Sequence, residues 1–132
     1  MKLTVHVDGG ARGNPGPAAI AAVLSDRDGE VIDSVSQLIG RATNNVAEYR
    51  ALILGIEQAA AHGATELEIV GDSELVVKQV RGEYKVKKPD LKPLHAAATA
   101  ALGRLDSWSI RHVRRELNAE ADRLVNEALD AA

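Results

Sequence analysis

The period of the hydrophobic pattern changes near residue 43, and this change limits the folds that the chain can adopt. Before it, residues 2–7 alternate apolar and polar side chains, and residues 17–40 contain two strand patterns around an Asp28-Gly29 hairpin signal. After it, the apolar residues of segment 44–62 recur every three or four positions, as in a helix packed on one face. Three strands followed by a helix predict a sheet with helices packed on it.

The rest of the chain alternates between strands and helices. Strands are predicted over 66–71 and 108–113, and helices over 73–80, over 90–102 and after 118. Thr43, Ser73 and Asn118 are the expected N-caps, and Asp90 is expected to start its helix. Antiparallel strands followed by this α/β alternation predict a mixed sheet flanked by helices.

Composition excludes several classes of protein. The 132 residues are 45% hydrophobic and 27% charged, as in one globular domain of ordinary size. There is no apolar run of about 20 residues and no signal peptide, so we expect no membrane partner and a cytoplasmic location. The absence of cysteine excludes disulfides and thiolate metal sites. No long apolar surface is evident, so a monomer is expected.

The charge balance is uneven along the chain. A net charge of −3 argues against general attraction to a polyanion. Segment 78–92 nevertheless carries six lysines and arginines against two acids, so it forms a local basic patch. The patch could be a solvated charged loop or a site of weak nucleic-acid binding. The sequence does not decide between these two interpretations.

Four of the nineteen acidic residues occupy unusual positions. Asp8 ends the first predicted strand, and Asp72 follows strand 66–71 at its carboxyl end, where α/β sheets gather functional groups. Glu48 and Asp122 lie beside the buried stripes of their predicted helices. A carboxylate pressed against a core costs several kcal/mol unless something compensates it.

Each of these acids also has a purely structural explanation. Asp8 could accept hydrogen bonds in a turn, Asp72 could cap the next helix, and Glu48 and Asp122 could favour their helix dipoles. Together, however, four such acids suggest one shared site, where converging carboxylates repel unless they hold a divalent cation. Because only oxygen ligands are on offer, a hard ion such as Mg²⁺ or Mn²⁺ is the natural occupant.

Residues 7–19, "VDGGARGNPGPAA", contain more glycine than a plain turn needs. An elaborate hairpin, a phosphate cradle and the edge of a metal site all fit this composition. With "GRATNNVAEYRAL", "GDSELVV" and "NAEADRLVN", the segment resembles the four signature segments of type 1 ribonuclease H, in the same order and at similar spacing. The likeness covers essentially the whole chain.

The resemblance implies one ribonuclease H catalytic domain over residues 1–132. Its fold would be α/β, with a five-stranded mixed sheet of three antiparallel strands, then parallel additions, flanked by helices. It also implies that two metal ions, Mg²⁺ with Mn²⁺ as a possible substitute, are bound by Asp8, Glu48, Asp72 and Asp122.

The implied activity is endonucleolytic hydrolysis of the RNA strand of RNA/DNA hybrids, which leaves 5′-phosphate and 3′-hydroxyl ends. Double-stranded RNA is a further substrate of some compact relatives and stays open here. Two alternatives are another two-metal nuclease of the same fold and a hybrid-binding module without catalysis. The glycine-rich and "TNNVAEY" segments argue against the first, and the presence of all four acids argues against the second.

The resemblance also implies substrate contacts. Glycines of the first segment would let the backbone approach the minor groove, asparagines would touch the hybrid, and a phosphate pocket would hold the DNA strand beside a helix N-terminus. These positions are Gly9, Gly10, Asn14, Asn44 and Asn45, with Arg41 and Thr43 for the phosphate pocket. Turn and capping duties are the structural alternative for the asparagines, and a simple turn is the alternative for the glycines.

The chain departs from the well-known bacterial form of the family in three places. The stretch from 81 to 94 is too short for the long basic protrusion, so the chain resembles the compact variants. Glu74 stands where several relatives have a substrate-contacting glutamine. Arg115, seven residues before Asp122, resembles the residue that compact relatives use in place of a mobile-loop histidine, and we prefer it to His112, which closes a strand pattern.

Overall fold

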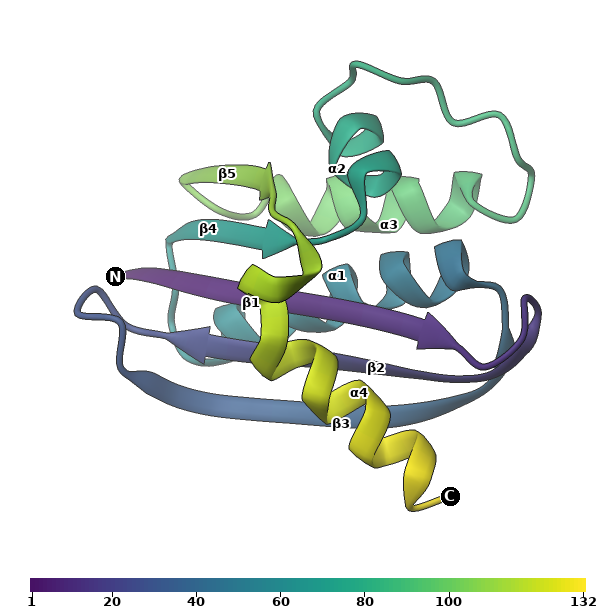
Figure 1. The fold of residues 1–132 in the computed structure, drawn as a ribbon. Coiled ribbons are helices and arrows are strands. Elements are labelled where there is room, and N and C mark those ends of the chain that lie inside the picture. Colours follow the sequence, from purple (N-terminus) through teal and green to yellow (C-terminus); the bar gives the residue numbers. More distant parts are fainter.

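A computed structural model describes all 132 residues as a five-stranded sheet flanked by four α-helices (Figure 1). The elements are β1 (Lys2–Ala11), β2 (Gly16–Ser25), β3 (Val31–Ala42), α1 (Asn44–Ala61), β4 (Glu66–Gly71), α2 (Glu74–Val80), α3 (Lys92–Leu102), β5 (Ser107–His112), the 3₁₀ turn η1 (Arg115–Asn118) and α4 (Ala119–Asp130). The strand order is β3-β2-β1-β4-β5. Pairs β1–β2 and β2–β3 are antiparallel, whereas pairs β1–β4 and β4–β5 are parallel. The predicted mixed sheet is therefore confirmed.

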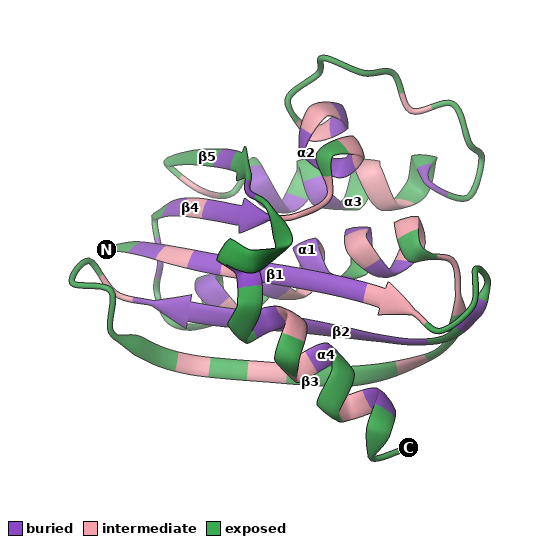
Figure 2. Ribbon diagram, in the orientation of Figure 1, coloured by how far each residue is buried: buried purple, intermediate pink, exposed green.

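Helices cover both faces of the sheet, but unequally. α1 and α3 lie behind the sheet in Figure 1, and α4 crosses its front over β1, β2 and β3. The main core forms between the sheet and α1, α2 and α3, and Figure 2 shows it as the buried central strands. α4 buries only a small cluster, made of Ala19 and Ala21 of β2 and its own Val125 and Leu129. Small alanine side chains let the helix approach the strand closely. None of the helices is both long and apolar enough to cross a membrane.

Two glycines allow α1 to pack closely on β1. A Cβ on Gly55 of α1 would lie 2.6 Å from Val7 Cγ1, and a Cβ on Gly9 of β1 would lie 2.3 Å from the backbone oxygen of Ala47. Gly9 is therefore required by packing inside the protein, which accounts for this glycine without any substrate. The contact brings the start of α1, with Glu48, beside the end of β1, with Asp8.

We expect Gly55→Ala to lower the free energy of unfolding by about 1–2 kcal/mol, because overpacking against Val7 outweighs the gain of ~1 kcal/mol in helix propensity. Gly103→Ala is the matched control. Its Cβ would meet only ordinary contacts, at 3.4 Å from Ala100 O, and we expect a change within about 0.5 kcal/mol. Urea denaturation measures both, and equal effects of the two substitutions would contradict close packing at Gly55.

Several element boundaries differ from the sequence predictions. β1 continues past Asp8 to Ala11 because residues 8–11 keep pairing with residues 18–21 of β2. α3 begins at Lys92 rather than Asp90, because the backbone NH groups of Leu91 and Lys92 first close a turn on Lys88 O. Thr43 and Ser73 are confirmed as N-caps: their hydroxyl oxygens accept from Val46 N at 3.2 Å and Val76 N at 3.3 Å.

Candidate active site

Three of the four singled-out acids meet at one edge of the sheet. Asp8 lies on β1, Asp72 follows β4, and Glu48 lies in the second turn of α1. One carboxylate oxygen from each lies within 4.8 Å of the other two. β1 and β4 are parallel neighbours, so their carboxyl ends meet at the same edge, where open α/β sheets place their ligand sites.

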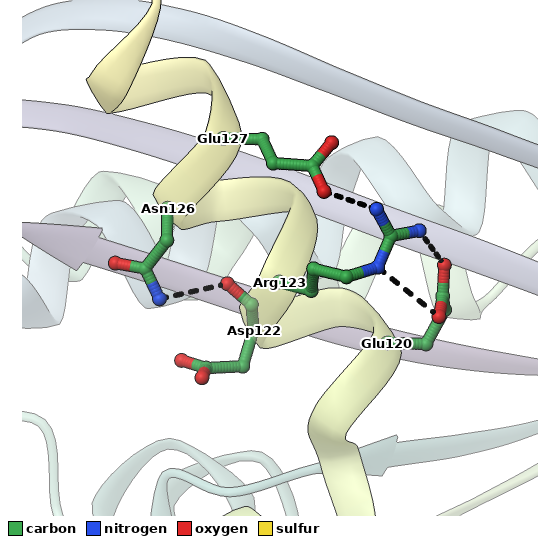
Figure 3. A network of polar contacts seen from close by, with 5 residues as sticks. All are labelled: Glu120, Asp122, Arg123, Asn126 and Glu127. Carbon is green, nitrogen blue, oxygen red and sulfur yellow. Dashed lines mark hydrogen bonds and ion pairs between the residues drawn. The ribbon is translucent and has the colours of Figure 1, made fainter.

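Asp122 approaches the same cavity from α4. The cavity has a volume of about 350 Å³ and is lined by all four acids. Figure 3 shows the Asp122 carboxylate turned away from Arg123, whose guanidinium pairs instead with Glu120 and Glu127. The carboxylate of Asp122 has no hydrogen-bond partner in the chain, and Asn126 Nδ2 donates only to its backbone oxygen, at 3.1 Å. The Asp122 charge is therefore left for the cavity rather than neutralised along its own helix.

The electrostatics of these acids are unfavourable in the protein alone. Burial, followed by the charges of Asp72 and Asp122, raises the pKa of Asp8 from 3.8 to about 8, and Asp8 as a whole residue is only 3% exposed. Burial and the charges of Asp8 and Asp72 also raise the pKa of Glu48 well above its usual range. Asp72 Oδ2 is buried and has no hydrogen-bond partner. Converging carboxylates with an unpartnered buried oxygen fit a hard divalent cation.

Arg115 is the cation nearest to Asp72. It begins η1, its Nε lies 3.6 Å from Asp72 Oδ2, and its side chain is 74% exposed. His112, the last residue of β5, does not line the cavity. The structure thus places the preferred residue of this pair at the site and leaves the other outside it.

The asparagines join the turn after β1 to the start of α1. Asn44 Oδ1 accepts from Ala11 N at 2.9 Å, and Asn14 Oδ1 accepts from Asn44 N at 3.0 Å. Both carbonyl oxygens are used inside the protein, and neither Nδ2 group has a partner in the chain. Asn44 and Asn45 line the cavity with Gly9 and Gly10, whereas Asn14 does not. The Nδ2 groups of Asn14 and Asn44 therefore remain available as hydrogen-bond donors.

The two residues of the expected phosphate pocket lie just outside this cavity. Arg41 is exposed near the end of β3, and Thr43 uses its hydroxyl to cap α1. Neither lines the cavity with the acids. Both stand beside the N-terminus of α1, where the helix dipole favours an anion.

The sequence also predicts Asn118 as a helix cap; Asn118 is the N-cap residue of α4, but its side chain has a different role. Asn118 makes no side-chain cap bond; it is 1% exposed, and its Nδ2 donates to Val7 O at 2.9 Å. It therefore ties the junction of η1 and α4 to β1 one residue before Asp8. Through this bond the element with Arg115 and the element with Asp122 are held near Asp8. The sequence signal for this anchoring role is the position of Asn118, four residues before Asp122.

We expect Asn118→Ala to lower the free energy of unfolding by about 2 kcal/mol, because Val7 O would remain buried without a partner. Asn126→Ala removes a similar but exposed amide from α4, and should change stability by no more than about 0.5 kcal/mol. Chemical denaturation of both variants checks this prediction. A loss at Asn126 equal to that at Asn118 would refute the anchoring role of the buried amide.

Comparison with known proteins gives consistent matches. The model of a family described as "Reverse transcriptase-like" matches residues 6–128. The chain is 49% identical over 133 residues to a bifunctional protein of Mycobacterium tuberculosis, with all of this chain but 36% of that protein covered. It is 47% identical to ribonuclease HI of Halobacterium salinarum, with 99% of this chain and 66% of that protein covered. The chain thus spans about a third of the mycobacterial relative's length and about two thirds of the halobacterial one's.

Solved structures agree with these sequence relatives. The crystal structure of RNase H1 from Halobacterium salinarum superimposes with a TM-score of 0.98 at 47% identity and covers 100% of both chains. The compost-derived LC11-RNase H1, crystallised in complex with an RNA/DNA hybrid, matches with a TM-score of 0.93 at 45% identity. That match covers 98% of this chain and 97% of the other.

Proposed function

Because this chain belongs to the type 1 ribonuclease H family, we propose that it is an endonuclease that hydrolyses the RNA strand of RNA/DNA hybrids. The observation that carries the proposal is the meeting of Asp8, Glu48 and Asp72 within 4.8 Å, with Asp122 on the same cavity. The hybrid bound to a relative that is 45% identical supports the choice of substrate. Products would carry 5′-phosphate and 3′-hydroxyl ends.

The four acids would hold two divalent ions, Mg²⁺ with Mn²⁺ as a possible substitute. The donors are all carboxylate oxygens, which suit hard ions, and the unpartnered Asp72 Oδ2 is available as a ligand. When bound, such ions would supply positive charge for the attacking water and for the departing 3′ oxygen. The fold itself would keep the four carboxylates at fixed positions before the substrate binds.

The residues around the acids would bind and orient the hybrid. Asn44 and Asn45 line the cavity, and the free Nδ2 of Asn44 is suited to donate to a groove oxygen, such as a 2′-hydroxyl. Asn14 would act partly by fixing Asn44. Gly9 and Gly10 would offer close backbone, and a DNA-strand phosphate would bind at Arg41 and Thr43 beside the α1 N-terminus. The exposed Arg115 would assist turnover next to Asp72.

The test is cleavage of an RNA/DNA hybrid whose RNA strand carries a 5′ label, in Mg²⁺, Mn²⁺ and EDTA. We expect metal-dependent internal cuts in the RNA, with 3′-hydroxyl ends. Terminal trimming would favour another two-metal nuclease of the same fold, and binding without cleavage in any metal would favour a hybrid-binding module. The same RNA as a duplex decides whether double-stranded RNA is also a substrate.

The remaining proposals concern residues 1–132 as a unit. Residues 1–132 would form a single catalytic domain, monomeric and cytoplasmic. Gel filtration of the chain with light scattering tests the monomer, and a dimer at micromolar concentration would exclude it.

A further inference from the structure

Arg12 is a cation at the active site that has no role so far. It begins the turn between β1 and β2, and its side chain lines the cavity with the four acids. Among the fifteen residues that line this cavity, only Arg12 and Arg115 carry positive charge. A cavity with four carboxylates repels a polyanion, so the few cations at its rim matter for how a nucleic acid approaches.

The turn holds the backbone of Arg12 in one place. Arg12 N donates to Pro17 O at 2.8 Å, and a Cβ on Gly16 would lie 2.0 Å from Arg12 O. Gly13 has a φ of +92°, a conformation that other residues rarely adopt. Much of the glycine in the first signature segment is therefore explained by a tight turn that presents the Arg12 side chain at the cavity.

The partners of Arg12 inside the protein do not account for it. Its Nη2 contacts Asp130 Oδ1 at 2.6 Å and Asn126 O at 3.5 Å, both on α4. The side chains of Arg12 and Asp130 are 48% and 68% exposed, and an exposed ion pair of this kind adds only about 0–1 kcal/mol to stability. Nε and Nη1 are left without a partner, so most of the guanidinium fork remains open to an anion.

We propose that Arg12 binds a backbone phosphate of the nucleic acid substrate, other than the one that is cleaved. The guanidinium of Arg12 contacts Asp130 and Asn126 O on α4 rather than any of the four acids that would hold the cleaved phosphate. The phosphate that Arg12 binds is therefore a neighbouring one along the backbone. The inference rests on the proposed function for the nature of the substrate, but it concerns binding and not the chemical step.

Asp130 competes with this phosphate. In the free protein it neutralises and aligns the guanidinium, and in the complex it would share Arg12 with the phosphate or give it up. Removal of the Asp130 charge should therefore strengthen binding, whereas removal of Arg12 should weaken it. A purely structural ion pair between the turn and α4 gives a different pattern, because loss of either partner would then have the same effect.

The test is equilibrium binding of a fluorescently labelled RNA/DNA hybrid in Mg²⁺, measured by anisotropy. Every variant carries Asp8→Asn as a background that prevents cleavage, so the result does not depend on activity. At about 100 mM salt we expect Arg12→Ala to weaken binding by about 5–10-fold and to lower the slope of log K against log salt by about 1. Asp130→Asn should strengthen binding about twofold.

Controls separate this site from general charge effects. Arg27→Ala removes an exposed arginine from the hairpin at the opposite end of β2 and should leave affinity and salt slope unchanged. Hybrids with one neutral methylphosphonate linkage, moved along each strand, should reveal one position that weakens binding of the Arg12 protein but not of Arg12→Ala. An unchanged salt slope in Arg12→Ala, or equal weakening by Asp130→Asn, overturns the proposal. If the wild type never cleaves the hybrid but the variants bind as described, the proposed function is refuted and this inference still holds.

Discussion

Asp8→Asn should reduce kcat for hybrid cleavage on the order of 1000-fold or more, the largest effect that we expect from any single substitution. Asp8 lies at the centre of the acid group, with oxygens within 4.8 Å of those of Glu48 and Asp72. Asparagine keeps the size of the side chain and one oxygen but removes the charge, so the fold is retained while the cation ligand is weakened. The loss therefore reports on the chemistry of the site rather than on folding.

Single-turnover cleavage with saturating enzyme measures this loss without a contribution from product release. Asp106→Asn is the matched control, because it neutralises an exposed aspartate outside the cavity and should leave the rate within about twofold. Retention of a tenth or more of the wild-type rate by Asp8→Asn would be incompatible with a cation held by this group of acids.

The same substitution should stabilise the protein in EDTA, with an effect that grows with pH. The pKa of Asp8 is raised by burial and by the neighbouring acids to about 8, so the folded protein retains a proton that the unfolded chain releases above about pH 4. Titration of Asp8 therefore lowers the stability of the wild type as pH rises from about 4 to about 8, by up to ~1.4 kcal/mol per pH unit. Asp8→Asn has no titrating group at this position, so its stability does not decrease with pH for this reason.

Urea denaturation at pH 5, 6 and 7 in EDTA checks this prediction. The stability difference between Asp8→Asn and the wild type should widen by about 2–3 kcal/mol between pH 5 and pH 7 in favour of the variant. Millimolar Mg²⁺ should narrow the difference, because a cation that binds only the folded acids stabilises the wild type more. A difference that is independent of pH would mean that Asp8 is ionised at low cost in the folded protein.

The sequence predicts the grouping of the acids better than it predicts the contacts that support this grouping. The mixed sheet follows from periodicity, and the meeting of Asp8 with Asp72 follows from the ends of two parallel strands, because such a pair brings its carboxyl ends together. Glu48 and Asp122 are indicated by their places beside the buried stripes of their helices. These features depend on local patterns, which one sequence contains.

The features that escaped prediction depend on partners far along the chain. The continuation of β1 to Ala11 is set by pairing with β2, against the local preference of three nearby glycines for a turn. Asn118 has the sequence of a cap, but its bond is to Val7, 111 residues away. The proposed role of Arg12 depends on its place in a cavity that residues of α4 also line. No periodicity in a single segment encodes such contacts.

The order in which the acids occur along the chain has a consequence for biosynthesis. Asp8, Glu48 and Asp72 belong to the first 72 residues, but Asp122 arrives on the last helix, which rests on a small cluster of four buried residues. During synthesis Asp122 therefore leaves the ribosome after the other three acids. In the finished protein, brief detachment of α4 would remove Asp122 and release Arg12 in one event. Amide hydrogen exchange should accordingly be faster along α4 than along the central strands.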